Sequence, residues 1–252
     1  MKVVLIFMLI LVSISPARAQ ELTGDDIIQK VNDILSPGSS HGTSKMTIIT
    51  TSGKERTFVM ESWSKNDGEK NLIRYSEPRR VKDQAVLMLN NADDIWMYFP
   101  RTQRVRKLAT HAKKQKMQGS DFSYEDMGSG DAFITDFTAK RLDDGKAEGE
   151  NCYCVELVKK KDSDMSYSRL IMWVIKENFY PIVIEYFDED DSERRIKRLV
   201  QSDIRVIDEI PTAWKVVMTN EEDNSRTTME VVDIEYNIDV DDHLFTERGM
   251  IR

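Results

Sequence analysis

The sequence has few of the residues and motifs that catalysis or metal binding needs. Histidine occurs three times, as His41, His111 and His243, and none stands in a zinc-binding spacing such as H-E-x-x-H. The chain has no G-x-S-x-G nucleophile elbow and no glycine-rich phosphate loop. These absences argue against zinc proteases, serine hydrolases and nucleotide-binding enzymes. We therefore expect a protein that is not an enzyme and that uses no metal or cofactor.

Cysteine is almost absent, because only Cys152 and Cys154 occur in 252 residues. Residues two apart in an extended strand point to the same face, with their Cα atoms about 7 Å apart. That separation exceeds comfortable disulfide geometry. We interpret the pair as two small side chains packed on a strand face, or as a strained disulfide at a bulge. A metal or redox pair is the less favoured alternative.

No glycine- or proline-rich linker and no repeat divides the chain, so we expect a single domain over residues 20–252. The net charge of −8 argues against general nucleic-acid binding, which favours a basic domain. An acidic cluster at residues 188–191 follows a predicted strand and lacks the central glycine of a calcium loop. We predict a solvated hairpin tip there.

Only one long apolar run occurs, from Val3 to Ile14. It follows a positive charge at Lys2 and precedes Ala17-Arg18-Ala19, whose small residues suit cleavage after Ala19. The run is shorter than the about 20 residues that span a bilayer. Residues 1–19 are therefore predicted to be a cleavable signal peptide, and the mature protein is expected in the periplasm or outside the cell.

Periodic patterns predict one helix followed by many strands. Thr23 and Asp26 resemble a capping box for an amphipathic helix that ends at Ser36-Pro37-Gly38. About a dozen segments with strand-like patterns follow, separated by turn residues. They cover residues 44–51, 55–63, 71–76, 84–89, 94–99, 135–142, 150–158, 168–176, 182–187, 193–204, 213–220 and 227–236. This spacing predicts a mainly β protein with one strongly curved antiparallel sheet or barrel.

A second short helix is predicted within residues 117–127, which read MQGSDFSYEDM. Gly119-Ser120-Asp121 is a start signal, because a Ser or Asp side chain can cap the free N–H groups of the first turn. Glu125 and Asp126 would complement the positive end of this helix. Its apolar side chains, Phe122, Tyr124 and Met127, indicate a helix that presses against an apolar surface.

A basic segment precedes that helix, and no acidic residue occurs between Pro100 and Gly119. Its basic residues are Arg101, Arg104, Arg106, Lys107, Lys113, Lys114 and Lys116. We consider Arg101, Arg104, Arg106 and Lys107 as candidates for docking acidic partners or lipid headgroups. The alternative is a strand and loop whose charges simply face water.

Three segments resemble the LolA-like outer-membrane lipoprotein-sorting family, in the branch with a GSDFSYEDM-type segment. They are Tyr98-Phe99-Pro100 with Arg104-Val105-Arg106-Lys107, then MQGSDFSYEDM, and Asp242-His243-Leu244-Phe245-Thr246. The resemblance implies an incomplete, half-open β-barrel with an apolar concave side and a lid of helical segments. It also implies a carrier of lipoprotein or lipid acyl chains between the inner and outer membranes.

The resemblance further implies an inner-membrane transporter of RND or ABC type and an outer-membrane acceptor as partners. Two alternatives stay open: an accessory protein of an RND-type exporter that binds a free lipid, or an RseB-like lipoprotein sensor. RseB-like proteins carry a further C-terminal domain, whereas the last predicted strand here ends at Tyr236, close to the end of this sequence. That difference favours the carrier over the sensor.

An acyl-chain carrier needs a large apolar pocket, because each methylene exposed to water costs about 0.8 kcal/mol. Strand alternation and the helix positions suggest which residues line it, although ordinary core packing would explain each of them as well. The candidates are Ile28, Val31, Phe58, Met60, Trp96, Tyr98, Phe122, Tyr124, Ile171, Trp173, Trp214 and Met218. The hypothesis requires unfilled apolar space beneath a helical lid.

Overall fold

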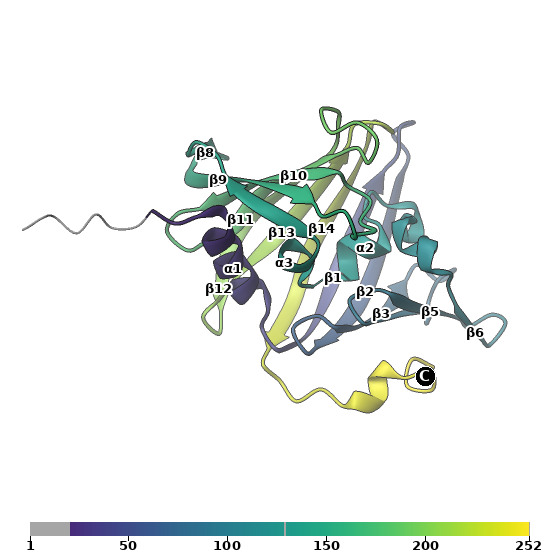
Figure 1. Ribbon diagram of the computed structural model, residues 1–252. Coiled ribbons are helices and arrows are strands. Elements are labelled where there is room, and N and C mark those ends of the chain that lie inside the picture. Colours follow the sequence, from purple (N-terminus) through teal and green to yellow (C-terminus); the bar gives the residue numbers. More distant parts are fainter. Residues whose placement is uncertain (1–20, 129, 252) are drawn as a thin grey trace, which may run out of the picture.

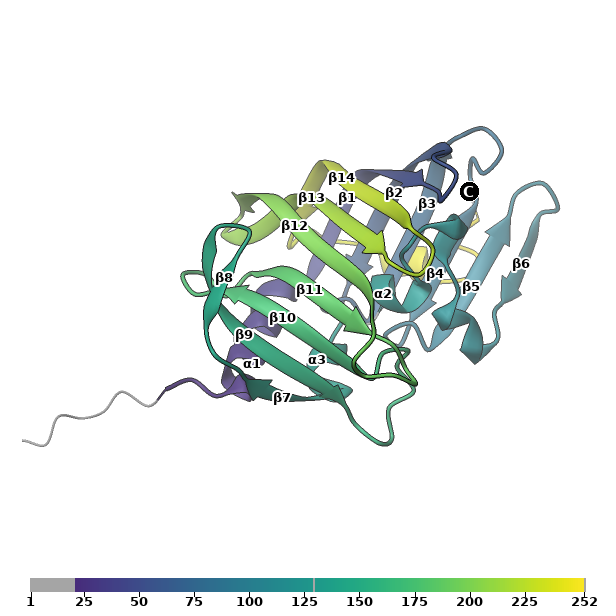
Figure 2. The same cartoon turned by 90° about the horizontal axis from the view of Figure 1, so that it is seen from above.

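The computed structural model describes residues 21–128 and 130–251, so the predicted signal peptide, residues 1–19, lies outside the described residues. The described residues form one antiparallel 14-stranded sheet with a few short helices (Figures 1 and 2). No helix in this part of the chain is long and apolar enough to cross a bilayer.

The strands follow one another around the sheet in the order β6-β5-β4-β3-β2-β1-β14-β13-β12-β11-β10-β9-β7, and β8 pairs with β9. Their bounds are β1 (Ser39–Ile49), β2 (Glu55–Lys65), β3 (Lys70–Glu77), β4 (Ala85–Leu89), β5 (Asp94–Phe99), β6 (Arg104–Lys107), β7 (Phe137–Arg141), β8 (Gly145–Ala147), β9 (Glu150–Lys159), β10 (Arg169–Ile175), β11 (Pro181–Phe187), β12 (Arg195–Ile207), β13 (Ile210–Asn220) and β14 (Ser225–Tyr236).

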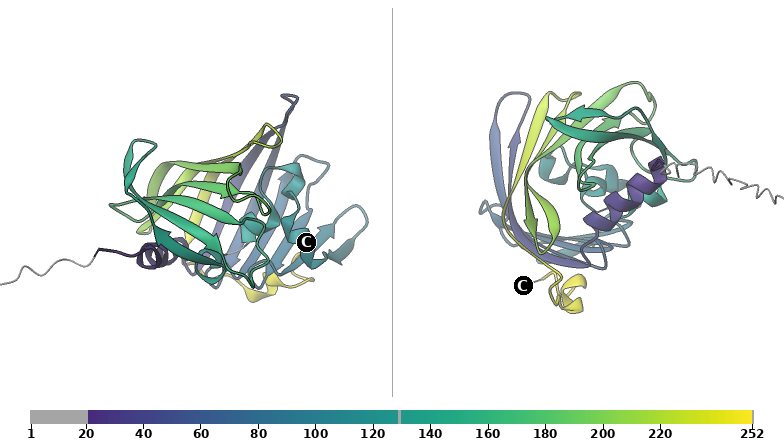
Figure 3. Two further views of the ribbon diagram at one scale, coloured as in Figure 1. Left: turned by 45° about the horizontal axis from the view of Figure 1, so that its top comes forward. Right: turned by 90° about the vertical axis from the view of Figure 1, so that its left-hand side faces the viewer.

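The sheet curves strongly but does not close, because β6 and β7 remain as its two edges. Figure 3 shows the curved sheet wrapped around the helical segments, with the C-terminal segment on the outside. The predicted half-open barrel is therefore confirmed. The twelve predicted strands all occur, whereas β6 and β8 were missed because they are only four and three residues long.

Helix α1 (Gly24–Leu35) begins and ends where the sequence predicts. Thr23 and Asp26 form a complete capping box, in which Asp26 Oδ2 accepts the Thr23 N–H and Thr23 Oγ1 accepts the Asp26 N–H. Its apolar residues Ile27, Ile28 and Val31 are buried. The helix packs against β7, β9 and α3 (Ala132–Thr135), so it covers one end of the concave face.

Two apolar clusters fill most of the concave face. One joins α1 and Phe122 to β9–β13, and the other joins Met117 and Tyr124 to β1–β5. Met127 and Met229 contact both clusters. The two halves of the curved sheet are thus linked through the helical segments that lie between them.

The C-terminal segment after β14 covers the outer face of β2–β5. Val240, Phe245 and Met250 are buried in one cluster with side chains of these strands. Asp242 reinforces the contact, since its carboxylate lies 2.9 Å from the Lys65 ammonium and 3.1 Å from that of Lys70. These strands are therefore buried on both faces.

Cys152 and Cys154 are both buried on β9 and are not joined by a disulfide. The interpretation as small packed side chains is confirmed. Cys154 packs with Ile171 and Phe187, and burial raises the pKa of its thiol to about 11. A thiol that stays protonated in this way is a poor nucleophile and a poor metal ligand.

Candidate functional site

A pocket of about 410 Å³ lies where the end of α1 meets the concave face. Its walls come from the C-terminal part of α1, from α2 (Tyr124–Gly128), and from both halves of the sheet. The lining residues include Ile34, Leu35, Ser40, Ser64, Asn71, Asp126, Met127, Tyr180, Gln201, Thr212, Ala213, Val231, Ile234 and Tyr236. Its volume falls within the range of about 300–1,000 Å³ that is typical of small-molecule sites.

The lining of this pocket combines apolar and polar side chains. Ala213, Val231 and Ile234 on β13 and β14 form an apolar wall. Ser40 and Ser64, on the adjoining strands β1 and β2, contribute hydroxyl groups beside it. Such a pocket suits an apolar chain that ends in a polar group.

The pocket stays open because the strands that form its floor carry small side chains and a bulge. The β1–β14 register shifts between Thr43 and Ser44, so Val232 drops out of the pairing and its side chain is 58% exposed. Val231 beside it lines the pocket. Sequence reasoning missed this site, although small residues recur at every second position in 40–44 and 62–64.

The segment from Lys116 to Gly128 crosses the concave face next to this pocket. Its helix, α2, begins at Tyr124, after the predicted start at Gly119-Ser120-Asp121. Ser123 is the capping residue, because its hydroxyl accepts the Asp126 N–H (3.0 Å) while Asp126 accepts the Ser123 N–H (2.7 Å). Phe122 and Tyr124 are 3% and 4% exposed, so this segment is part of the core.

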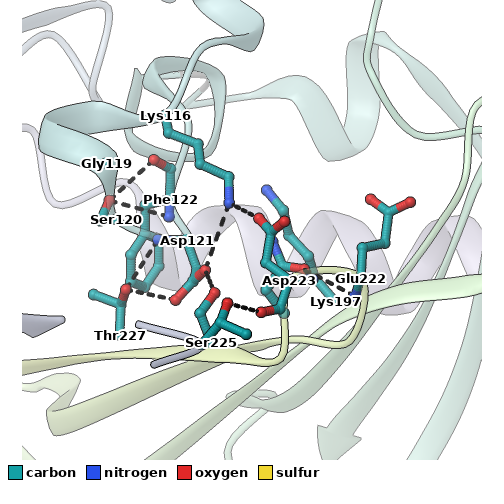
Figure 4. A network of polar contacts seen from close by, with 12 residues as sticks. Lys116, Gly119, Ser120, Asp121, Phe122, Lys197, Glu222, Asp223, Ser225 and Thr227 are labelled. Atoms are coloured by element: carbon teal, nitrogen blue, oxygen red, sulfur yellow. Dashed lines mark hydrogen bonds and ion pairs between the residues drawn. The ribbon is translucent and has the colours of Figure 1, made fainter. Parts of the chain in front are cut away.

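Asp121 fastens this segment to β14 (Figure 4). Its carboxylate accepts hydrogen bonds from the hydroxyls of Thr227 (2.7 Å) and Ser225, and its N–H donates to Thr227 Oγ1 (2.9 Å). Lys116 lies 3.8 Å from the same carboxylate and also pairs with Asp223. Asp121 is 1% exposed, so its charge is compensated almost entirely by these groups.

Asp126 fastens the other end of the segment to β12. Its Oδ1 accepts the Tyr167 hydroxyl (2.8 Å), and its Oδ2 lies 3.2 Å from the Lys197 ammonium. Lys197 also donates to the Tyr167 oxygen at 2.8 Å, which closes the triangle. Burial, aided by the Asp126 charge, raises the pKa of Tyr167 well above its ordinary value, so this hydroxyl remains a donor. The two acids predicted to complement the positive end of the helix do lie in the first turn of α2, and their side chains are also buried.

Glu125 is a third buried acid, with 1% of its surface exposed. Its two carboxylate oxygens accept hydrogen bonds from the N–H (3.0 Å) and the hydroxyl (3.1 Å) of Ser166. Burial raises the pKa of Glu125 above its ordinary value of 4.5, even though these two hydrogen bonds act in the opposite direction.

We expect Glu125→Gln to be more stable relative to the parent protein as the pH rises. A carboxyl whose pKa is raised by folding contributes most stability below its unfolded pKa and loses that contribution as pH rises through its folded pKa. Glutamine can accept the Ser166 N–H with its amide oxygen and donate its NH2 group to the Ser166 hydroxyl oxygen, without carrying a charge. Melting temperatures measured from pH 4 to 8 should diverge between the two proteins, whereas the exposed Glu55→Gln control should track the parent. Parallel curves for Glu125→Gln would contradict the assignment.

The structure brings seven of the twelve predicted lining residues together on the concave side. They are Ile28, Val31, Phe58, Met60, Phe122, Tyr124 and Met218, and all are at most 4% exposed. These side chains are packed within the two concave clusters, and none of them lines the 410 Å³ pocket. Their contact with a ligand stays a prediction.

The other five predicted lining residues lie elsewhere. Trp96 and Tyr98 pack beneath the C-terminal segment on the outer face, and Ile171 and Trp173 pack with Cys154. Trp214 lies against Arg205, whose guanidinium is 4.4 Å from the ring centroid. Alternation gave the wrong face at Trp96, Tyr98, Ile171 and Trp173, because their strands are apolar on both faces.

The basic segment divides into paired and unpaired residues. Lys113 pairs with Asp93 and Asp164, Lys114 with Glu189, and Lys107 with Asp94. Arg101, Arg104 and Arg106 are exposed, and no ion pair joins them to any of the described residues. These arginines are the part of the segment that is available to a partner.

Comparison with known proteins gives the family. A family model with the description "Uncharacterized protein" matches residues 67–252, and no curated protein matches. Among solved structures, a domain named for outer membrane lipoprotein sorting, from Vibrio parahaemolyticus, is 24% identical with a TM-score of 0.82. The match covers 91% of this chain and 98% of that one.

Two further structures agree with that fold. A DUF1329 family protein from Desulfovibrio piger is 25% identical with a TM-score of 0.82, over 90% of this chain and 97% of the other. A LolA superfamily protein from Nitrosomonas europaea is 20% identical with a TM-score of 0.74, over 90% and 99%. The chain belongs to the matched family and has the LolA-like fold. The predicted resemblance of this chain to LolA-like proteins is confirmed.

Proposed function

We propose that this LolA-like protein is a periplasmic carrier that shields acyl chains of a lipid or lipoprotein during transfer between membranes. The 410 Å³ pocket beneath α1 and α2 is the observation on which this proposal rests. The pocket has an apolar wall for a chain and hydroxyls for a polar group. No bond chemistry is required of such a protein, because shielding needs only apolar surface and a route for release.

Movement of α1 away from the sheet would uncover the apolar part of the concave face that α1 now fills. The pocket would then become larger. Ile28 and Val31 attach α1 to the concave cluster, and displacing them would expose Phe122 and Met218 to the chain. By contrast, the segment containing α2 is fixed by Asp121 and Asp126, so we propose that it stays in place. Cargo would therefore enter along α1.

A free lipid is a second candidate cargo, as expected for an accessory protein of an exporter. The polar lining residues Ser40, Ser64 and Gln201 favour a ligand whose polar group enters the pocket with its chain. In that case the partner is an RND-type exporter. In the lipoprotein case the partners are an inner-membrane transporter and an outer-membrane acceptor.

Native mass spectrometry of the mature protein purified from the periplasm, combined with lipid extraction, tests these proposals. Acylated peptide supports lipoprotein transfer, and free lipid supports the exporter accessory. We expect one of them to co-purify and to be displaced by an apolar fluorescent probe. Protein that is repeatedly empty and that also ignores the probe would refute both.

A further inference from the structure

A second pocket, of about 260 Å³, lies at the β6 end of the sheet and is lined by three arginines. Arg80 comes from the turn between β3 and β4, Arg101 from the turn between β5 and β6, and Arg106 from β6. Phe99 and Pro100 complete its apolar part. In Figure 1 the β5–β6 hairpin projects from the molecule at the end away from α1.

No described residue forms an ion pair with the arginines of this pocket. Arg80, Arg101 and Arg106 are all exposed. The Arg106 guanidinium lies 5.9 Å from the Phe99 ring centroid, which orients it without neutralising it. Glu77 is the last residue of β3 and Asp83 lies in the same turn as Arg80, and neither forms an ion pair with Arg80.

More cations surround the pocket. Arg79, Lys82 and Arg104 are also exposed and belong to the same turn or to β6. In a chain of net charge −8, six unpaired cations at one end create a strong local field. An anionic surface would repel the rest of this acidic protein. The end that carries the six cations would therefore turn toward that surface.

We propose that the arginine pocket binds the phosphate group of an anionic phospholipid at a membrane surface. A guanidinium presents parallel N–H donors that match two phosphate oxygens. Phe99 and Pro100 place apolar groups between the cations, where the headgroup region meets the acyl chains. This site goes beyond the proposed cargo function and does not depend on it, because the two pockets share no residue.

A membrane fits this surface better than an acidic polypeptide added to the free edge of β6. Such a strand would contact Arg104 and Arg106 on the edge, but Arg80 and Arg101 lie in two separate turns. The cations are thus spread over one end of the molecule. This arrangement suits the phosphates of a membrane surface, which lie in a plane.

Sedimentation with vesicles tests the proposal. Mature protein should bind phosphatidylglycerol vesicles at low salt, bind phosphatidylcholine vesicles poorly, and lose binding as salt screens the charges. Combining Arg80→Gln, Arg101→Gln and Arg106→Gln should weaken binding about a hundredfold, because each basic residue near an anionic membrane contributes about fivefold. The control combines Lys54→Gln, Lys146→Gln and Lys215→Gln, three exposed lysines that lie in the β1–β2 turn, on β8 and on β13.

An equal loss in the control would overturn the proposal, because it would mean that net charge and not the pocket governs binding. Absence of vesicle binding by the parent protein at low salt would also overturn it. Binding of glycerol phosphate or polyglutamate without any binding of vesicles would also overturn it. That result would assign the pocket to a soluble anion or an acidic polypeptide. Unchanged melting temperature in the triple variant would confirm that the arginines act on binding and not on folding.

Discussion

Replacing Lys197 by methionine should lower the free energy of unfolding by about 3–5 kcal/mol, because it leaves the Asp126 charge buried without its cationic partner. The Asp126 side chain is only 3% exposed and that of Lys197 only 11%, so water cannot substitute for the lost ammonium. Tyr167 and Ser123 would still donate to the carboxylate, but they cannot neutralise it. Urea unfolding followed by tryptophan fluorescence measures the change.

The matched control is Lys215→Met on the neighbouring strand β13. Lys215 is exposed and pairs with no acid in the described part of the chain, so its replacement should change stability by less than about 0.5 kcal/mol. Adding Asp126→Asn to Lys197→Met should recover more than half of the loss, because the uncompensated charge is then gone. Equal stability of Lys197→Met and the parent protein would show that this pair does not fasten the segment.

Val231→Trp should weaken binding of an acyl-chain probe roughly fiftyfold, because the indole occupies space that about three methylenes would fill, each worth about 0.8 kcal/mol. Val231 lines the apolar wall of the 410 Å³ pocket from β14. The pocket already has unfilled space, so we expect little change in melting temperature. Titration with a fluorescent fatty acid measures the affinity.

Val232→Trp is the control, since Val232 is the next residue and is 58% exposed at the bulge. It adds the same side chain outside the pocket, and probe affinity should not change. If both variants bind the probe like the parent protein, acyl chains do not use this pocket. A collapse of folding in Val231→Trp alone would instead show that the wall is packed tightly against its neighbours.

Local sequence signals predicted the regular elements well, because they depend on neighbouring residues. The capping box of Thr23 and the alternation in β12 and β13 identify their elements without any tertiary information. The predicted helix in residues 117–127 occurs, but its start is shifted because Asp121 binds Thr227 on a distant strand. A side chain that bonds far along the chain is not available as a cap.

The lining residues were harder to predict, because alternation identifies a face only when the other face is wet. The C-terminal segment covers β4 and β5 from outside, so the outer face of these strands also carries apolar side chains such as Trp96 and Tyr98. In the sequence this outer face cannot be told from a concave face. A sequence pattern identifies bulky apolar residues, but it does not identify where a cavity remains between them. Ser40 and Ser64 help to form the pocket by being small, which only the fold makes visible.

The sequence alone determined a β-rich chain with a capped N-terminal helix, an acidic net charge with one basic segment, and membership of a LolA-like group. The strands, the helix cap and the charges follow from local propensity, periodicity and composition, whereas the LolA-like resemblance rests on three short sequence segments. The tertiary structure decided where space remains, which acids became buried anchors and which arginines stayed unpaired. The pocket and the buried anchors depend on residues far apart in the sequence, such as Asp126 and Lys197, meeting across the curved sheet.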